Sequence, residues 1–342
     1  MNRNEHGALS VVFPVQPSDQ KAFKEFARWV QEHPGARLWT GQSMGISGFQ
    51  AAAYVAGGGV HVPFGFGVNL MTLMHPVELA IQARALAALS GHEVMAGIGT
   101  GGPAFVRAMT GREETRPAAR TREYLDVARR TLSGEHFVHD GEFYDVEGMF
   151  APLASPPVSF GAGVLRPRMA HTAGGAADFM VSWLAPPAWL RETLVPALER
   201  GAVEAARARP RVVAYLHAAL RRPGRVAEDL VAAGNSAHLS AAHYADALRQ
   251  AGVTVEPNGS VSPRTLIENG VFGFGSAAEV HASIDQLWSS GADEVALNLS
   301  GVYLTEGASA VLKDLDEIFE YVHGARSVEP WRLSGGAAHA RW

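Results

Sequence analysis

The sequence predicts a single-domain α/β protein of the (β/α)8 TIM-barrel class. Short apolar, β-branched segments alternate with helical patterns along nearly the whole chain of 342 residues. Eight of these segments have the character of buried strands, and a helix follows each in the expected alternation. No internal repeat or linker composition divides the chain. We therefore expect one barrel domain over residues 1–325, followed by a flexible tail over residues 326–342.

The first half of the barrel is predicted from four strand–helix pairs. Phe23, Phe26 and Trp29 share one face of the first helix, and the third helix carries a proline in its first turn and Gly91 at its end. The second helix is a short alanine-rich stretch. The predicted strands are residues 9–15, 36–41, 59–68 and 93–99, and the other three helices are residues 19–33, 75–91 and 116–134.

The alternation pauses after the fourth pair and then resumes. An Asp-Gly pair between apolar and aromatic residues predicts a surface hairpin over residues 136–150. A glycine- and proline-marked helical and loop insertion is expected at about residues 234–275. The second half is predicted as strands at residues 156–163, 178–184, 211–220 and 294–300, with helices at residues 187–206 and 307–324.

The composition excludes several functional classes. Cysteine is absent, which excludes disulfides, thiolate metal sites and a cysteine nucleophile, and suits a cytoplasmic protein. The formal net charge is −5 and the arginines are scattered, so no nucleic-acid partner is expected. No segment is long enough to span a bilayer. The only lysines, Lys21, Lys24 and Lys313, fall in predicted outer helices, which argues against Schiff-base chemistry.

The ends of the predicted strands carry almost no carboxylates. In a barrel of this class the reactive groups lie at the carboxyl ends of the strands. His238 and His243 are spaced i, i+5, and no His-Glu-x-x-His motif occurs. We therefore expect neither a metal site nor the paired acids of a glycosidase.

The run GIGTGG, residues 97–102, matches the dinucleotide fingerprint G-x-G-x-x-G. That motif requires a helix opening within it, yet Pro103 follows the glycines and a helical pattern resumes only near Pro117. The sequence therefore argues against an NAD site.

Glycine also crowds the ends of the third, fourth and fifth predicted strands. Glycine inside strands commonly marks close approach of a ligand, with tight barrel packing as the alternative. Arg120, Arg166 and Arg168 lie nearby in the sequence. Backbone amides together with arginine predict a cradle for a phosphate.

Several runs resemble, in the same order, segments of the bacterial-luciferase-like superfamily, whose members use flavin or coenzyme F420. The resemblance extends over about residues 8–324 and implies an oxidoreductase, usually a homodimer. The runs are GVNLMTLMHPVELAIQARALAALSGHEVMAGIGTG, TREYLDVARRTLSGE, HDGEFYDVEG, AGGAADFMVSWLAPP and FGSAAEVHASIDQLWSSGADEVALN.

The resemblance implies where the cofactor binds. The ring would lie against a bulge in the third strand that holds a non-prolyl cis peptide, at Gly67–Val68. The phosphate would lie against the loops after the fourth and fifth strands, with Arg120 or Arg166 as counter-charge. The implied cofactor-binding residues are Trp39, Gln42, Ser43, Gly67, Val68, Asn69, Gly99, Thr100, Gly101, Arg120, Ala162, Gly163, Val164, Arg166 and Trp183.

Three residues are candidate catalytic acids: His75, Tyr215 and His217. His75 precedes a proline at a helix start, so a structural cap is the alternative. Tyr215 and His217 share a face of the seventh strand. They could supply a proton at the barrel mouth, or lie lower down as satisfied polar groups of the core. Core filling is likewise the alternative for Trp39 and Trp183.

The expected reaction follows from the resemblance and one departure from it. Many members carry an Asp-His pair after the second strand, where this chain has Gln42-Ser43, which cannot act as a general base near neutral pH. The Gly-Val bulge is similar to the methylenetetrahydromethanopterin-reductase-like branch and favours coenzyme F420 over FMN. We expect hydride transfer to an electron-poor C=C or C=N bond of a small-molecule or peptide substrate, such as a dehydroamino acid in natural-product biosynthesis. The alternatives are an FMN-dependent monooxygenase served by a separate reductase, and a non-catalytic flavin-binding barrel.

Overall fold

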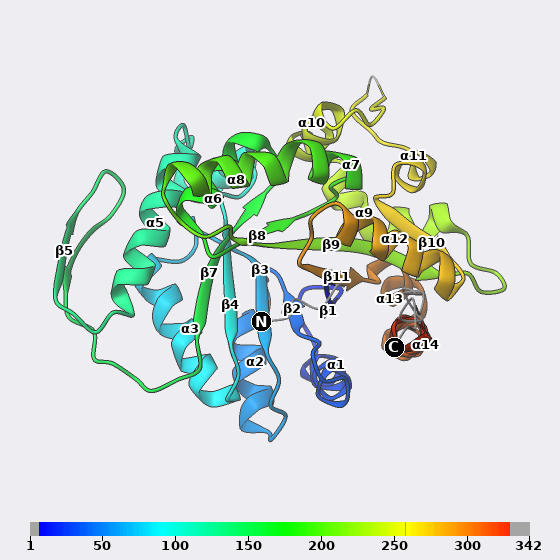
Figure 1. Ribbon diagram of the computed structural model, residues 1–342, viewed down its shortest axis with the longest axis horizontal. Helices are drawn as coiled ribbons and strands as arrows, with labels where there is room; N and C mark the ends of the chain where they lie inside the picture. Colours follow the sequence, from blue (N-terminus) through cyan, green and yellow to red (C-terminus); the bar gives the residue numbers. More distant parts are fainter. Residues whose placement is uncertain (1–6, 257, 329–342) are drawn as a thin grey trace, which may run out of the picture.

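The computed structural model describes residues 7–256 and 258–328, and it is built around a closed ring of eight parallel strands with helices packed outside (Figure 1). Each strand pairs with the next, and the last pairs with β1. These are the eight predicted strands, so the TIM-barrel prediction is confirmed. In ring order they are β1 (Ala8–Val12), β2 (Leu38–Thr40), β3 (Phe64–Leu70), β4 (Val94–Gly99), β7 (Val158–Val164), β8 (Phe179–Ser182), β9 (Arg211–Leu220) and β11 (Glu294–Asn298).

A ninth strand, β10 (Phe272–Gly275), lies beside the end of β9. Its four residues pair with His217 to Leu220, the carboxyl-terminal part of β9. This strand lies within the segment predicted as a helical and loop insertion, and that prediction is wrong for these four residues. The reason is local: the strand reads FGFG, and two glycines in four residues suppress the β-branched pattern by which strands are predicted.

The outer layer is formed by helices whose ends follow ordinary capping chemistry. Proline occupies the first turn of α3, α5 and α6, where its missing N–H has no intrahelical acceptor. Ser276 and Glu279 form a reciprocal capping box at the start of α12. These outer helices are α1 (Gln20–Glu32), α2 (Gly48–Gly57), α3 (Pro76–Ser90), α5 (Pro117–Thr131), α6 (Pro167–Ala176), α7 (Pro187–Trp189), the π-helical turn η1 (Leu190–Leu194), α8 (Val195–Glu204), α12 (Ala277–Ser289), α13 (Ser300–Glu306) and α14 (Ala308–Val328).

The inside of the ring is filled by a small separate core. Trp39 and Phe179 are fully buried there and meet edge-to-face with ring centroids 5.9 Å apart. A Cβ on Gly65 or Gly161 would collide with the Trp39 or Phe179 ring, so glycine makes room for both aromatic side chains. The Trp39 indole N–H donates to Glu294, 2.6 Å away. The barrel is therefore plugged below its carboxyl-terminal rim.

The predicted hairpin region, residues 136–150, contains the antiparallel pair β5 (Phe137–Asp140) and β6 (Asp145–Gly148), which lies against α5 (Figure 1). The Glu123 carboxylate on α5 accepts hydrogen bonds from the backbone N–H groups of Phe143 and Tyr144 at 2.9 and 2.8 Å. These bonds hold the hairpin to the barrel.

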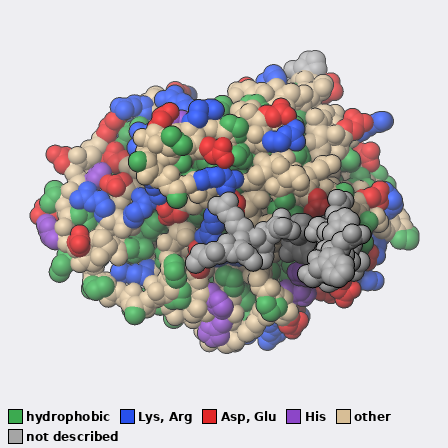
Figure 2. All heavy atoms as spheres, in the orientation of Figure 1, with side chains coloured by type: hydrophobic (Ala, Val, Ile, Leu, Met, Phe, Trp, Pro, Cys, Tyr) green, Lys and Arg blue, Asp and Glu red, His purple; other side chains and the backbone are tan. Residues whose placement is uncertain are grey.

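The last helix, α14, extends three residues into the predicted tail, to Val328. The rest of that tail lies outside the described residues. None of the described helices combines the length and apolarity that a bilayer crossing requires. On the face shown in Figure 2, acidic and basic side chains are interspersed.

A buried ion pair joins α14 to the segment after β9. Asp314 is 1% exposed and Arg225 5%, and their side chains are directly paired. Arg222 also donates to Asp314, at 3.0 Å. Arg225 is also paired with Glu306 on α13, at 2.6 Å, so the buried charges belong to a network of arginines and carboxylates that compensate one another.

We predict that Asp314→Ala lowers the free energy of unfolding by about 3 kcal/mol, because it removes the buried carboxylate that contacts both Arg222 and Arg225 and leaves Arg225 with Glu306 alone. Denaturant titration measures this change. Glu320→Ala removes an exposed carboxylate from the same helix and should change the value by less than about 0.5 kcal/mol. Equal effects of the two substitutions would contradict a role of the buried pair in holding α14.

Candidate active site

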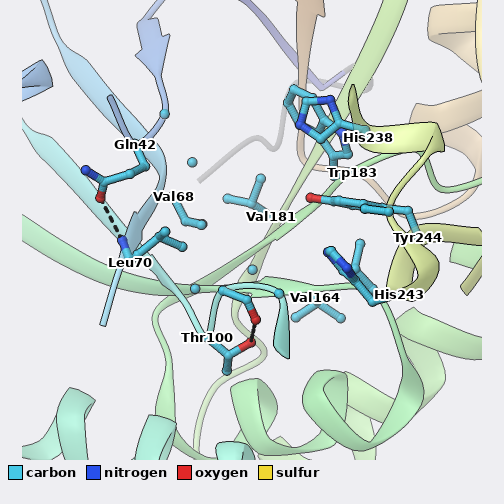
Figure 3. Close-up of a pocket in the computed structure, with 18 of the residues that line it drawn as sticks. Gln42, Val68, Leu70, Thr100, Val164, Val181, Trp183, His238, His243 and Tyr244 are labelled. Atoms are coloured by element: carbon cyan, nitrogen blue, oxygen red, sulfur yellow. Dashed lines mark hydrogen bonds between the residues drawn. The ribbon is translucent and has the colours of Figure 1, made fainter. Parts of the chain in front are cut away.

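A cavity of about 820 Å³ opens at the carboxyl ends of the strands (Figure 3). Its lining comes from the ends of β1, β2, β3, β4, β7, β8 and β11, from the middle of β9, and from a helical segment between β9 and β10. Small-molecule sites have volumes of about 300–1,000 Å³, and in barrels of this class they lie at this rim. The cavity is therefore the candidate active site.

The floor of the cavity is made by a bulge in β3. The pairing of β3 with β4 shifts register between Phe66 and Asn69, and the Gly67–Val68 peptide bond is cis, as the family resemblance implies. A Cβ on Gly99 would lie 2.5 Å from a γ-carbon of Val68, and a Cβ on Gly163 would lie 3.2 Å from the other. Glycine at these two strand ends therefore accommodates Val68 and leaves main chain facing the cavity. The packing interpretation of these glycines is confirmed, and the ligand bed stays a prediction.

The glycine run GIGTGG leads directly into a helix, α4 (Pro103–Thr110), with Gly102 as its N-cap residue. This corrects the sequence analysis, which begins the next helix only near Pro117; Pro103 occupies the first turn and starts the helix rather than preventing it. No side chain of the described residues forms a capping hydrogen bond at the helix start. Thr100 and Gly101 line the cavity beside it, and Gly101 has φ of +78°. Free N–H groups of a first turn attract anions, so this loop is suited to a phosphate.

The two arginines expected as counter-charge are both occupied. Arg120 does not line the cavity; it pairs with Glu114 at 3.0 Å and donates to the Tyr144 hydroxyl at 3.0 Å. Arg166 lines the cavity but pairs with Asp246 at 2.5 Å.

Arg168 also lines the cavity, and within residues 7–256 and 258–328 it forms no ion pair. It is therefore the lining cation with charge available for a ligand. The sequence analysis places Arg168 near the cradle but not among the counter-charges, because the pairing of Arg120 and Arg166 depends on acids brought close only by folding.

Trp183 and Tyr215 line the inner end of the cavity, with ring centroids 5.3 Å apart. The Tyr215 hydroxyl is buried against Gly67 of the bulge and has no hydrogen-bond partner among the described residues. Burial, with a smaller contribution from the Glu294 carboxylate, raises the pKa of Tyr215 well above its usual value. Tyr215 therefore stays protonated beneath the floor, as an unsatisfied rather than a satisfied polar group.

His217 lies deeper, behind the Trp183 ring at 4.8 Å between centroids, and it does not line the cavity. It is 1% exposed, and its Nε2 lies 3.4 Å from the Asn298 side-chain nitrogen. Burial, with a smaller contribution from His238, lowers the pKa of His217 to about 3. The structure thus places this candidate acid in the core and keeps it neutral at ordinary pH.

Gln42 lines the cavity, and its side chain is held on both sides. Its Oε1 accepts from the Leu70 N–H at 3.0 Å (Figure 3). Its Nε2 donates to the Ser43 carbonyl at 3.0 Å. Ser43 and Asn69 are buried and do not line the cavity; the Ser43 hydroxyl accepts from the Gly45 N–H at 3.1 Å. Gln42 thus fastens the end of the bulge to the loop after β2.

Three further predicted site residues lie away from the cavity lining. Trp39 belongs to the plug inside the barrel, and Ala162 is buried in the main core between the ring and the helices. His75 caps α3, because its Nδ1 accepts from the Val77 N–H at 3.3 Å. A structural cap is the alternative to a catalytic acid that the sequence analysis gives for His75. The predicted residues that do line the cavity are Gln42, Gly67, Val68, Gly99, Thr100, Gly101, Gly163, Val164, Arg166, Trp183 and Tyr215.

Three residues that the sequence analysis does not place in the site complete its wall: His238 from α9 (Ala227–Leu239), and His243 and Tyr244 from α10 (Ala242–Gln250). Burial lowers the pKa of both histidines and raises the pKa of Tyr244 to about 12. In the sequence, the only notable feature of the two histidines is their spacing of i, i+5, which does not suit a metal. In the described part of the chain, no group of three or more potential metal ligands is found. Nothing in the local sequence shows that α9 and α10 fold over the rim.

Residues 9–294 match the family model described as luciferase-like monooxygenase, and the chain belongs to this family. The predicted family is thereby confirmed. A relative from Mycobacterium tuberculosis, named provisionally as a coenzyme F420-dependent oxidoreductase, is 30% identical over 98 residues. That match spans 29% of this chain and only 28% of the relative's length.

Two solved structures illustrate the fold. The coenzyme F420-dependent tetrahydromethanopterin reductase of Methanopyrus kandleri superposes with a TM-score of 0.69 at 19% identity, over 92% of this chain and 99% of that one. The oxygenating constituent of the 3,6-diketocamphane monooxygenase of Pseudomonas putida, in complex with FMN, superposes with a TM-score of 0.67 at 16% identity, over 92% and 96%. At these identities the likeness extends to the fold. F420 and FMN, named for these proteins, are the two cofactors weighed from the sequence.

The low pKa of the buried His217 predicts how the free energy of unfolding depends on pH. Between pH 6.5 and 3 the unfolded chain binds a proton that folded His217 does not, so acid favours unfolding, by about 2 kcal/mol at pH 5. We expect His217→Gln to reduce the difference in unfolding free energy between pH 7 and pH 5 by about 2 kcal/mol. Denaturant titrations at both pH values measure it. The exposed His92→Gln is the control; an unchanged difference in His217→Gln would refute the low pKa.

Proposed function

We propose that the protein is a coenzyme F420-dependent reductase that transfers hydride to an electron-poor C=C or C=N bond of a small-molecule or peptide substrate. The observation that carries the proposal is the cavity floor: the β3 bulge at Gly67–Val68 and the glycines at the ends of β4 and β7 present main chain rather than side chains. A flat ring fits such a surface. The uncapped start of α4 and the unpaired Arg168 fit its phosphate.

The cofactor assignment is supported by the relatives named for coenzyme F420, with FMN as the alternative. When bound, reduced coenzyme F420 supplies a hydride. The residues proposed to hold it are Thr100, Gly101 and Arg168 at the phosphate and Gly67 and Val68 under the ring, because these line the cavity and leave main chain or an unpaired charge facing it.

Reduction is favoured over alcohol oxidation by the residue that we expect beside the cofactor ring. Gln42 occupies the place of a general base, yet its amide is neutral and already hydrogen-bonded to the Leu70 N–H and the Ser43 carbonyl. An alcohol substrate would find in Gln42 no base to take its proton. Reduction needs a proton donor instead, and the cavity wall there carries the neutral side chains of His238 and Tyr244.

The second candidate function is an FMN-dependent monooxygenase, favoured by the family's description and by the FMN complex of the camphane monooxygenase. Oxygen-dependent product formation distinguishes it from the reductase. The third, a binding barrel without activity, predicts cofactor binding with no turnover of any unsaturated acceptor. A dehydroamino acid substrate, a homodimer and a cytoplasmic location stay predictions.

We predict that purified protein binds coenzyme F420 more tightly than FMN, and that Gly101→Val weakens F420 binding at least about tenfold because the side chain enters the phosphate loop. Gly111→Val is the matched control. Gly111 closes the other end of α4 with φ of +69°, so both variants carry a similar backbone penalty, but it does not line the cavity.

Absorbance or fluorescence titration with each cofactor measures the affinities. Tighter binding of FMN would favour the monooxygenase. Equal losses in the two glycine variants would contradict the loop's role as the phosphate cradle.

A further inference from the structure

The segment between β9 and β10 brings a continuous row of rings to one side of the cavity. Along it, the Trp183 and His238 centroids are 4.9 Å apart, His238 and Tyr244 5.3 Å, and Tyr244 and His243 4.3 Å. All four residues line the cavity. We call these four residues the aromatic wall. Three of them come from α9 and α10 rather than from a barrel strand.

The aromatic wall is fastened to the loops that form the proposed phosphate site. A Cβ on Gly102 would lie 2.9 Å from the His243 ring, so the imidazole packs on the glycine loop. Arg166, at the start of α6, donates to the His243 carbonyl at 3.2 Å and to Asp246 at 2.5 Å. The wall therefore has a defined position relative to the cavity floor.

The space beside the aromatic wall carries little net charge. Buried neutral imidazoles and a phenol form the wall, and residues 12–15 add the apolar sequence VFPV. The charged lining residues are Glu114, Arg166 and Arg168, of which the first two are neutralised in ion pairs. Arg168 follows β7, beside the glycine cradle. An anionic group next to the wall would lose its hydration without gaining an unpaired cation.

Tyr244 supplies a polar group pointing into this space. Its hydroxyl end is directed into the cavity toward Val181 (Figure 3), and no hydrogen bond reaches that hydroxyl from any described residue. An unpaired donor at the edge of an apolar slot is suited to one acceptor atom on a ligand.

From these observations we propose that the aromatic wall forms the substrate slot, which takes a planar, uncharged acceptor whose reducible bond is conjugated with a carbonyl, and that the Tyr244 hydroxyl donates a hydrogen bond to that carbonyl oxygen. The inference rests on the proposed function, for which it names the substrate class.

The proposed reduction has two steps, addition of hydride and then of a proton. Hydride from the reduced cofactor adds two electrons and a proton to the β-carbon, and the C=C electron pair moves toward the carbonyl oxygen. The Tyr244 O–H stabilises the negative charge that develops on this oxygen. A proton from water then adds to the α-carbon, which completes the reduction of the double bond and leaves the cofactor oxidised.

Two probes of nearly equal shape test the charge preference. trans-Cinnamamide is neutral and trans-cinnamate is anionic at pH 7, and both carry a conjugated C=C–C=O unit. We expect equilibrium dialysis in phosphate buffer, with and without oxidised coenzyme F420, to give at least about tenfold tighter binding of the amide. Equal or tighter binding of cinnamate, or no binding of cinnamamide at millimolar concentrations, would contradict the proposal that the aromatic wall binds an uncharged acceptor.

A substitution tests the hydrogen bond. Tyr244→Phe should weaken cinnamamide binding about 2- to 10-fold, which corresponds to the loss of one hydrogen bond. Binding of trans-β-methylstyrene, which has no carbonyl, should not change. Tyr54→Phe, at an exposed tyrosine outside the cavity, is the matched control.

Equal affinity of cinnamamide for Tyr244→Phe and for the unchanged protein would refute the role of Tyr244, as would an equal loss for both probes. The measurement without cofactor keeps this test separate from the proposed function. If coenzyme F420 does not bind but cinnamamide binds more tightly than cinnamate, the cofactor assignment is wrong and the proposed substrate slot is still supported.

Discussion

The packing of Val68 into the spaces left by Gly99 and Gly163 is the contact on which the cavity depends. A Cβ at Gly99 would lie 2.5 Å from a γ-carbon of Val68 and would force it to move, and one at Gly163 would lie 3.2 Å from the other γ-carbon and crowd it. Because of this contact, main chain of β3, β4 and β7 lines the cavity at Gly67, Gly99 and Gly163. The same geometry places the glycine loop and the start of α4 at the edge of the floor, where a phosphate can meet backbone N–H groups.

The barrel interior supports this floor from below. Tyr215 touches Gly67 from inside the ring, and its ring packs against Trp39 at 5.8 Å between centroids. Trp39 in turn is tied to Glu294 on β11. These residues are far apart in the sequence, yet they form one column under the bulge. Burial, with a smaller contribution from the Glu294 carboxylate, raises the pKa of Tyr215 and keeps the phenol protonated. The packed interior therefore supports the cavity floor and supplies no reactive group to it.

Sequence reasoning succeeded where the signal is local and failed where contacts between distant segments decide. Eight apolar runs are sufficient to predict eight buried strands, whereas β10 is hidden by its two glycines. The GIGTGG run predicts an anion site, but the proline after the glycines hid the helix α4, which begins at Pro103. The availability of an arginine depends on which acids folding brings beside it, so Arg168 could not be separated from Arg120 and Arg166 in advance. The wall formed by α9 and α10 has no sequence signature either, because their placement over the rim depends on tertiary packing.

The central claim is that the main-chain floor at Val68 carries a redox ring whose phosphate is held by the loop before α4. A crystal structure of the protein with oxidised coenzyme F420 tests it most directly. The account predicts the ring in contact with Gly67 and Val68, and the phosphate within hydrogen-bond distance of the backbone N–H groups of residues 100–102 and of the Arg168 guanidinium. A ring bound elsewhere, or a phosphate held away from that loop, would contradict it.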